Sequence, residues 1–554
     1  VLRGIADAAL RLRHAETVDA AGRLQVENLR CAANTDRYVS RGDPREIFEP
    51  RFTGHGFRYA EIEGDPALLE GLEVRAVHVR SAVRSIGHFS CSDERLNRIH
   101  AIAVRTEANN LHGLPTDCPQ RDERLGWLND MTVRAEEAVH NFGLDRLYEK
   151  WIDDIADTQG GVTGAIADTA PAFRFGRAPA DPVCASYLLV PWLAYLHYGD
   201  RRILTDHYAG FQAWVNYLEN LAEEGILSFS SYGDWAPPIG QARAESIGAG
   251  ALSMATPGAL MSTGYWYFQL TVLAKMAAIL GDRAGADRFA AKAAAVGAAF
   301  NRAFLDPATG RYATGSQACQ VFPLYLGLVP DGVRPAVVAR LVEALAAADG
   351  HLTTGNLCTK YLPEVLAADG RIDLALSLLR QETYPSWGYM LAQGATTVWE
   401  RWEHVVAGPQ CGMASHNHPM YGAVDAFFYN TLAGIRPMEA GPGFEEFRLR
   451  PALESGLEKV FVRLETPRGR LETGWEIDSE KRITLPVQVP WNAVAWLEVP
   501  AGRVARAGEI RESGRVIWRA GVFVPGADGV EAGGAEGDLI RFRIRSGSYR
   551  FQMG

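Results

Sequence analysis

A long run of helical sequence in the middle of the chain is the feature that most limits its fold. From about residue 89 to residue 436, apolar residues recur with the spacing of one helix face, and helices follow one another across short polar turns. A long helix opens at Thr256-Pro257 and ends near Gly281, with proline in its first turn and glycine after its end. Roughly a dozen helices in this length suit a closed ring of helical hairpins better than a small bundle. Such a ring carries its functional site at one end, where loops between helices converge.

Sequence typical of β-strands flanks the helical run on both sides. Apolar and polar residues alternate in 57–62 and 77–80 on the N-terminal side, and strand-like segments recur at 460–464 and 496–500. Because strands must pair or close, we expect a β-sandwich at each end, the first of which lacks some of its strands.

The chain is therefore expected to be a multidomain, mainly helical protein. Its expected parts are a partial β-sandwich over 1–88, a helical domain over 89–436 and an antiparallel β-sandwich over 437–554. Within the helical domain, further helices are predicted over residues 144–159, 206–224, 286–305, 335–350 and 372–381.

Composition excludes some partners. The net charge is −10 and the chain contains no block rich in lysine and arginine, so neither nucleic acid nor a membrane is expected as a partner. No apolar run approaches the length of a membrane span. Seven cysteines without a Cys-x-x-Cys pair favour reduced thiols over disulfides or a zinc site. They are residues 31, 91, 118, 184, 319, 358 and 411. We expect no metal and no cofactor, and the oligomeric state stays open.

The N-terminus bears on localisation. The chain opens on Val1, with neither methionine nor a signal peptide. We interpret it as a fragment without its natural start. The reduced thiols favour the cytoplasm, while an export signal upstream would not be visible.

The segment DCPQRDERLGW (residues 117–127) contains three carboxylates, two guanidiniums and an indole within eleven residues. Carboxylates and guanidiniums bind sugar hydroxyls, an indole packs on the C–H face of a sugar, and one acid can protonate a leaving oxygen. Crowding should keep at least one acid protonated near neutrality, while the arginines hold their closest partners ionised. The alternative is a capping aspartate followed by an exposed, charged first turn of a helix. The groups concerned are Asp117, Asp122, Glu123, Arg121, Arg124 and Trp127.

A second carboxylate should lie far along the chain, because a barrel brings distant loops together. Glu400 is the best candidate, in the segment GATTVWERW (394–402), where it follows Trp399. The aromatic segment YPSWGY, which contains Trp387, comes just before it. The alternative is a buried aromatic helix that carries one salt-bridged glutamate.

These segments resemble those of bacterial α-L-rhamnosidases of glycoside hydrolase family 78. The resemblance implies an (α/α)6 barrel. It also implies that Glu123 is the proton donor and Glu400 the general base that activates water. By the same resemblance, three residues hold the sugar hydroxyls and an indole lines the side that carries the rhamnose methyl group. These are Asp117, Arg121, Asp122 and Trp127, and the aromatic segments add Trp387 and Trp399.

Two further segments fit the same family. An Asn-His pair binds the sugar in relatives, which makes His418 the matching residue in Ser415-His416-Asn417-His418. His416 and His418 could instead be a metal pair, but no third ligand stands at a recognisable spacing. Asp234-Trp235 resembles the family's Gly-Asp-Trp, and a plain turn with a core tryptophan is the alternative.

The chain departs from the family pattern in two places. Before Val190-Pro191-Trp192 it has Pro-Val-Cys-Ala-Ser (182–186), where many relatives have tryptophan and a small or acidic residue. This difference bears on the contacts of the leaving group. After Trp402 the chain continues Glu-His-Val (403–405) where relatives commonly have Asp-Gly-Trp.

The sequence therefore predicts an inverting, exo-acting α-L-rhamnosidase that hydrolyses rhamnosylated small molecules or oligosaccharides. Three alternatives stay open. The same fold could act on another α-linked or 6-deoxy sugar, or serve as a non-catalytic sugar-binding scaffold. A metal-dependent hydrolase built on His416 and His418 is the third.

Overall fold

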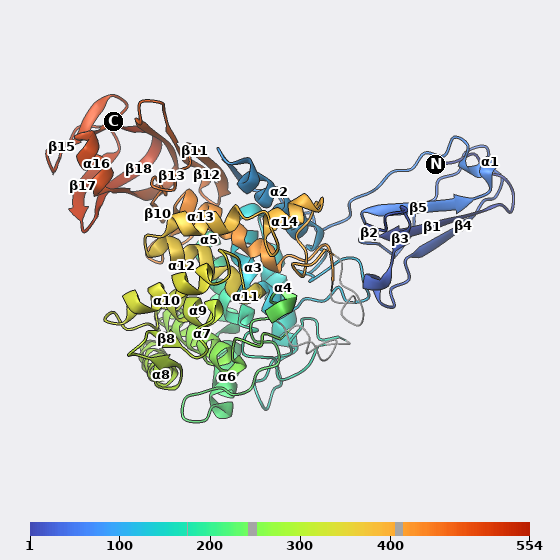
Figure 1. Ribbon diagram of the computed structural model, residues 1–554, viewed down its shortest axis with the longest axis horizontal. Helices are drawn as coiled ribbons and strands as arrows, with labels where there is room; N and C mark the ends of the chain where they lie inside the picture. The colour runs from blue at the N-terminus through green and yellow to red at the C-terminus, as the bar shows by residue number, and fades with distance from the viewer. Residues whose placement is uncertain (174–175, 242–251, 405–413) are drawn as a thin grey trace.

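The computed structural model describes residues 1–173, 176–241, 252–404 and 414–554. In Figure 1 a small group of N-terminal strands lies on one side of a helical domain, and a large sheet lies on the other. This arrangement confirms the expected fold class, a helical barrel between two β domains. Val405 and Cys411 lie outside the described residues, whereas the six other cysteines are free thiols.

The N-terminal domain is built on three antiparallel strands with the first of them in the centre. In sheet order these are β4 (Thr35–Val39), β1 (Ala9–Ala15) and β5 (Tyr59–Gly64). Shorter elements surround them: β2 (Thr17–Val18), β3 (Leu24–Gln25), the 3-10 turn η1 (Glu27–Leu29) and α1 (Pro66–Leu69). Leu2, Leu10 and Leu68 form its small core.

The prediction of a strand at 77–80 is wrong. Residues 72–84 form an irregular segment that leads to the helical domain, and Val74, Val77 and Val79 are exposed. Alternation makes a strand only where a neighbouring strand offers its backbone groups, and here the alternating residues face solvent.

The helical domain has two concentric layers. The inner helices are buried on nearly all sides and pack against one another in a ring, which η5 (Met420–Val424) closes against α3 and α11. They are α3 (Leu128–Asn141), α5 (Ser186–Tyr198), α7 (Gly258–Leu280), α9 (Gln317–Tyr325), α11 (Asn356–Thr359) and α12 (Tyr361–Ala368). The outer helices bury one face only, as an amphipathic pattern predicts. They are α2 (Glu94–Asn109), α4 (Asp145–Asp157), α6 (Arg202–Leu221), α8 (Arg283–Phe304), α10 (Arg334–Ala346) and α13 (Ile372–Leu379).

Short elements complete the barrel. These are η2 (Ile239–Gln241), the hairpin β7 (Leu305–Asp306) and β8 (Arg311–Tyr312), α14 (Trp387–Ala392), α15 (Asp425–Phe427) and the π-helical turn η6 (Phe428–Leu432). The predicted long helix is confirmed as α7, which follows Pro257 and is capped by Gly281 in the left-handed conformation (φ 87°). The other five predicted helices are confirmed as α4, α6, α8, α10 and α13. Among the described helices, the longest stretches are too short or too polar to cross a membrane.

The C-terminal strands form a sheet of 11 strands in which most neighbours are antiparallel. Two long strands, β13 (Ile483–Pro500) and β18 (Leu539–Met553), pair along most of their length, with an irregularity between Val489 and Val494. Such an irregularity bends strands and helps a sheet to fold over into a sandwich. The other elements are β9 (Ile435–Pro437), β10 (Glu446–Leu449), β11 (Lys459–Thr466), β12 (Gly469–Ile477), α16 (Ala501–Ala507), β14 (Glu509–Glu512), β15 (Arg515–Arg519), β16 (Val522–Phe523) and β17 (Val530–Glu536).

One strand of this sheet comes from before the barrel. Strand β6 (Gly87–Cys91) pairs with β11, with Phe89 opposite Val462. The expected domain limit at residue 88 therefore falls inside a strand. This pairing ties the two ends of the helical domain together, so the start of α2 is anchored to the C-terminal sheet.

Candidate active site

The acid-bearing segment is the loop between α2 and α3. It closes on itself, because the amide of Asp117 donates to the carbonyl of Leu125 (3.0 Å) and the amide of Leu125 donates to Asp117 Oδ1 (2.8 Å). Arg124 turns the chain back with a φ of 55°. The loop enters the inner helix α3 directly after Trp127, which places its side chains at one end of the barrel.

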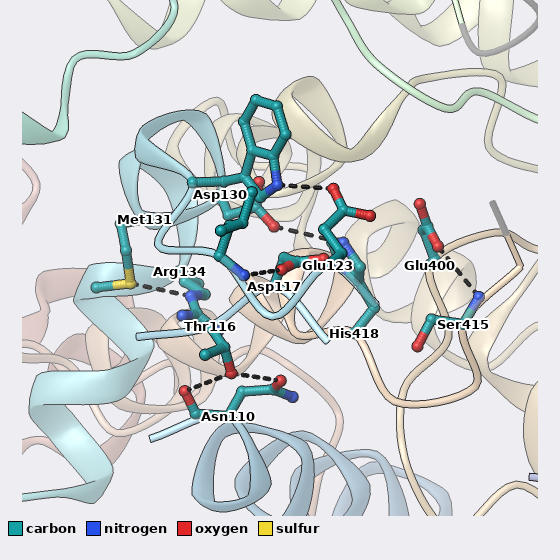
Figure 2. A network of polar contacts seen from close by, with 12 residues as sticks. Asn110, Thr116, Asp117, Glu123, Asp130, Met131, Arg134, Glu400, Ser415 and His418 are labelled. Atoms are coloured by element: carbon teal, nitrogen blue, oxygen red, sulfur yellow. Dashed lines mark hydrogen bonds and ion pairs between the residues drawn. The ribbon is translucent and has the colours of Figure 1, made fainter. Parts of the chain in front are cut away.

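The guanidinium of Arg121 joins the two glutamates that the sequence singled out. On one edge, Nε and Nη2 both lie 2.8 Å from Glu123 Oε2. On the neighbouring edge, Nη1 lies 2.8 Å from Glu400 Oε2 and Nη2 lies 3.3 Å from Glu400 Oε1. Arg121 itself is buried. Figure 2 shows the side chains of Glu123 and Glu400 extending in the same direction from two separate segments. The structure thus brings together residues that lie 277 positions apart (400 minus 123).

Glu123 is surrounded by N–H donors. Besides Arg121, the indole Nε1 of Trp127 donates to Oε1 at 2.8 Å, and Arg30 Nη2 lies 3.1 Å from Oε2. The side chain is 8% exposed. Charge-assisted contacts of this kind fix the direction of a carboxylate.

Glu400 is held by its own loop. Its amide donates to the carbonyl of Ser415 at 2.9 Å, and the amide of Ser415 donates back to Glu400 Oε2 at 3.1 Å. The hydroxyl of Ser415 donates to Gln120 Oε1 at 2.9 Å, which links this loop to the acid-bearing one. The Glu400 side chain is 2% exposed, so it lies below the protein surface.

Asp117 is the third carboxyl of the cluster. A possible ligand oxygen of Asp117 lies within 4.8 Å of one on Glu123, and Oδ2 is 3.6 Å from Arg121 Nη2. Burial, with the negative charge of Glu123 beside it, raises the pKa of Asp117 to about 7. From the sequence, crowding among the acids is the expected cause of such a rise, whereas in the structure burial is the larger cause and the charge of Glu123 comes second.

Asp122 faces the N-terminal domain. Arg30 Nε donates to Oδ1 and Cys31 Sγ donates to Oδ2, both at 2.7 Å. Although its burial acts in the opposite direction, the hydrogen bonds from Cys31 and Arg30 lower the pKa of Asp122. Its carboxylate thus takes part in a domain contact, and its role in holding a sugar hydroxyl stays a prediction.

Three aromatic side chains, Trp127, Tyr232 and Trp235, pack in a row beside the carboxylates. The ring of Tyr232 contacts Trp127 on one side and Trp235 on the other, with centroid distances of 5.8 and 5.6 Å and near-perpendicular planes. The hydroxyl of Tyr232 donates to Asp168 Oδ2 at 2.8 Å. Trp127 and Trp235 are therefore both near the cluster, and Tyr232 is the residue between them.

Two residues predicted to bind sugar, Asp234 and Trp387, are buried and hydrogen-bonded to the protein backbone. Asp234 is buried, and its carboxylate accepts from the amides of Gly355 (2.7 Å) and Cys358 (3.0 Å), at the start of α11. Burial raises the pKa of Asp234 to about 6. Trp387 is buried too, with Nε1 donating to the carbonyl of Tyr421 and its ring edge-on to Trp402. Both side chains stabilise the barrel end in this structure.

The histidines of the second segment differ in their partners. His418 Nε2 lies 3.4 Å from Asp130 Oδ1, and its amide donates to the carbonyl of Val398 at 2.9 Å. Burial, with Arg121 next, lowers the pKa of His418 well below its usual value. His416 instead stacks on Trp399 at 4.6 Å and contacts the carbonyl of His404 through Nε2. The two imidazoles thus have separate surroundings.

Sequence reasoning missed Asp130, which lies in the first turn of α3. Burial, with Asp117 as the next cause, raises the pKa of Asp130 well above its usual value. Its position three residues after Trp127 was the available signal. Figure 2 shows Asp130, Glu123 and His418 around the same part of the site.

Two groups of side chains in the described residues have ligand atoms close enough together for a metal ion. One is Asp117, Cys118 and Glu123, whose carboxylates already accept from N–H groups. The other is His14, Asp36 and His55, in the N-terminal domain. There the two imidazole rings stack at 4.2 Å with a 12° angle, so their in-plane lone pairs do not converge on one point.

Glu16 supports the site from the N-terminal domain. Its Oε2 accepts from the amide of His416 (2.9 Å) and from Asn28 Nδ2 (2.8 Å). Burial raises the pKa of Glu16 to about 8. Since the folded state then binds this proton more tightly than the unfolded state, its contribution to stability falls as the pH rises from about 4.5 to about 8.

Glu16→Gln should remove this pH dependence. The amide oxygen can accept the same hydrogen bonds without a charge, so the melting temperature should match the wild type near pH 5. By about pH 9 the variant should melt higher by about 2 °C or more. Glu63→Gln, in the same domain and 48% exposed, is the control and should change little at either pH. Equal melting curves for Glu16→Gln and wild type at both pH values would contradict the assignment.

Comparisons with known proteins cover all three parts of the chain. The bacterial alpha-L-rhamnosidase 6 hairpin glycosidase domain matches residues 84–432. The family's concanavalin-like domain matches residues 2–80, and its C-terminal domain matches residues 434–514.

Similar proteins of known structure share the whole fold. An alpha-L-rhamnosidase from Dictyoglumus thermophilum is 36% identical with a TM-score of 0.89, over 100% of this chain and 60% of that chain. The Streptomyces avermitilis alpha-L-rhamnosidase, solved in complex with L-rhamnose, is 31% identical with a TM-score of 0.86, over 100% of this chain and 50% of that one.

The curated relatives are longer than this chain. An alpha-L-rhamnosidase of Streptomyces avermitilis is 34% identical over 558 residues, which cover 99% of this chain and 50% of the relative. One of Formosa agariphila is 32% identical over 89% of this chain and 52% of the relative. The chain thus spans about half the length of the curated relatives it matches. By its three matching domains and its fold, the chain belongs to the bacterial alpha-L-rhamnosidase family.

Proposed function

We propose that the chain carries the catalytic site of an inverting, exo-acting α-L-rhamnosidase. Its substrates would be small molecules or oligosaccharides that end in an α-L-rhamnosyl residue. The observation that carries the proposal is the placement of Glu123 and Glu400 on neighbouring edges of the Arg121 guanidinium. The names of the similar proteins and the rhamnose complex of one of them support the sugar.

The arrangement of the two glutamates supports a single displacement. Glu123 and Glu400 bind adjacent edges of the Arg121 guanidinium, so the cation separates the two carboxylates. Inverting glycosidases need carboxyls roughly 6.5–9.5 Å apart, which leaves room for a water molecule, whereas retaining ones hold theirs roughly 5–5.5 Å apart. In the proposed reaction Glu123 protonates the glycosidic oxygen, while Glu400 removes a proton from the water that attacks C1 from the opposite face.

Asp117 is the proposed source of the proton for the leaving group. Ligand oxygens of Asp117 and Glu123 lie within 4.8 Å of each other. Burial, with the negative charge of Glu123 beside it, raises the pKa of Asp117 to about 7, so Asp117 can hold a proton near neutrality. When the sugar binds, its hydroxyls would compete for the N–H donors of Arg121, which favours proton transfer toward Glu123.

Hydrolysis of a panel of aryl glycosides tests the proposal. The α-L-rhamnoside should be hydrolysed faster than the other α-linked and 6-deoxy sugars, and NMR of early product should show the β anomer. Accumulation of the α anomer would point to a covalent intermediate and to a different second acid. Faster hydrolysis of another sugar would change the substrate. Calorimetry that shows L-rhamnose binding without any turnover would leave a binding scaffold instead.

A structure of the rhamnose complex gives a second test. The proposed mechanism requires a water molecule within hydrogen-bond distance of Glu400, on the face of C1 opposite Glu123. A complex in which packed side chains fill that face would exclude Glu400 as the base.

A further inference from the structure

The N-terminal β domain reaches the carboxylates of the site through one side chain. Arg30 follows η1 and its side chain is 25% exposed. Its Nε lies 2.7 Å from Asp122 Oδ1, and its Nη2 lies 3.1 Å from Glu123 Oε2. One guanidinium from another domain thus holds two successive carboxylates of the acid-bearing loop.

The backbone around Arg30 is shaped for this contact. Arg30 has φ 56° and ψ −117°, a conformation that residues with a Cβ rarely adopt. Such strain persists only where the surroundings impose it, and it gathers at functional sites. The next residue, Cys31, donates through Sγ to the other oxygen of Asp122. The turn therefore presents two consecutive side chains to the same loop.

The domain also touches the loop that carries Glu400. Asn28 Nδ2 donates to the carbonyl of Ala414 at 3.2 Å, and Glu16 accepts from the amide of His416. The residue between these two contacts is Ser415, whose amide binds Glu400.

The packing at this contact is close. A Cβ on Gly56 would lie only 2.7 Å from backbone atoms of Pro119 and Gln120. The acid-bearing loop and the loop that carries Glu400 thus both contact the N-terminal domain.

The contacts form a line of alternating charge. Arg30 binds Glu123, Glu123 binds Arg121, and Arg121 binds Glu400. Without Arg30, Glu123 keeps Arg121 and Trp127, which lie on the barrel side, and nothing described holds it from the side of the N-terminal domain. A carboxylate with fewer directional donors takes up several orientations, and a misplacement of about 1 Å costs about 10²-fold in rate.

We propose that the N-terminal β domain is part of the catalytic machinery and that Arg30 is a positioning residue, which orients Glu123 toward Arg121 and Glu400. This inference rests on the proposed function, in which Glu123 is the acid.

Arg30→Met tests the inference, with Arg30→Lys as the conservative variant. The matched control is Arg13→Met, since Arg13 lies in the same domain, is 29% exposed and pairs with Glu61 at 2.8 Å. For an aryl α-L-rhamnoside, Arg30→Met should lower kcat about 10²-fold, because Glu123 loses its orientation, and KM should change less than kcat, because Cys31 still donates to Asp122. Arg30→Lys should recover part of the loss, and Arg13→Met should stay within about twofold of wild type.

The pH profile separates positioning from mere stability. Loss of a cation beside an acid favours its protonated form, so the basic limb of the kcat/KM profile should move to higher pH in Arg30→Met. A fold defect would lower the rate without moving the limb. Melting temperatures of all three variants check that they fold.

A crystal structure of Arg30→Met gives a readout independent of turnover. The Glu123 carboxylate should leave the position it has in the wild type, or lose order. If Glu123 keeps its position and kcat and the pH profile match the wild type, the inference is overturned. If the wild type has no rhamnosidase activity, the proposed function fails, and the position of Glu123 in the variant still decides whether Arg30 orients it.

Discussion

Glu123→Gln and Glu400→Gln are each expected to lose about 10²–10⁴-fold in kcat on an aryl α-L-rhamnoside with a poor leaving group. Glutamine keeps the shape of the side chain and can still accept from Arg121, so both variants should fold. Each lacks the proton transfer that its residue provides in the proposed mechanism. Steady-state rates and melting temperatures of the two variants beside the wild type are the measurement.

The leaving group should separate the two roles. A dinitrophenolate departs without protonation, so Glu123→Gln should approach wild-type rates on the dinitrophenyl rhamnoside. Glu400→Gln should be equally impaired on all leaving groups, because its defect concerns the attacking water. Azide, which needs no deprotonation, should restore turnover to Glu400→Ala and give a β-linked azide.

Glu343→Gln is the matched control for both variants. It lies on the outer helix α10, is 61% exposed and pairs with Arg340, so its rate should stay within about twofold of wild type. A near-normal rate on the poor leaving group in either active-site variant would remove that residue from its role. Reversed leaving-group behaviour would exchange the two roles.

The helical part of the fold could be predicted because its signals are local. Proline before α7 and Gly281 after it mark the ends of one helix within the sequence itself. The sequence also distinguishes the two kinds of helix, because a helix that buries one face has apolar residues on that face only, whereas a fully buried helix is apolar all round. These signals need no knowledge of distant residues.

The strand pairings that cross domains could not be predicted. Strand β6 joins a partner that lies more than three hundred residues along the chain, since Phe89 is opposite Val462. The alternating valines of 77–80 gave a strand signal with no partner beside them. Periodicity predicts which face of a strand is apolar, but not which strand lies next to it.

The candidate site was predicted unevenly for the same reason. The two glutamates stand in family-like segments, and their common contact with Arg121 agrees with the expected convergence of loops. Arg30 and Glu16 come from another domain, in segments without a local pattern. The Gly-Asp-Trp segment was recognised, yet the carboxylate of Asp234 caps the start of α11, because a buried loop must pair its backbone amides.

Arg121→Met is expected to have the largest effect on stability. The guanidinium contacts Glu123, Glu400 and Asp117 while it is buried itself. Its removal leaves several carboxyls in a site of low polarity without their cation. Loss of one partner from a buried ion pair costs about 3–5 kcal/mol, and turnover should disappear because nothing then fixes the two glutamates relative to each other.

The loss should depend on pH in a definite direction. Arg121 opposes the rise in the pKa of Asp117, so without it the folded-state pKa of Asp117 moves further above the value in the unfolded chain. A carboxyl with a raised pKa stabilises the fold at low pH and loses that contribution as the pH rises through the folded-state value. The gap in melting temperature between variant and wild type should therefore be small near about pH 5 and widest near about pH 8.

Arg121→Lys is the matched variant, because it keeps the positive charge but lacks the planar guanidinium that binds one carboxylate on each of two edges. It should recover most of the stability at about pH 8 and little of the turnover, since an ammonium cannot hold two carboxylates on neighbouring edges. The two effects can thus be measured separately, by thermal unfolding and by rates on the aryl rhamnoside. A lysine variant with wild-type rates would show that charge alone organises the site, and the argument from the shared guanidinium would then fail.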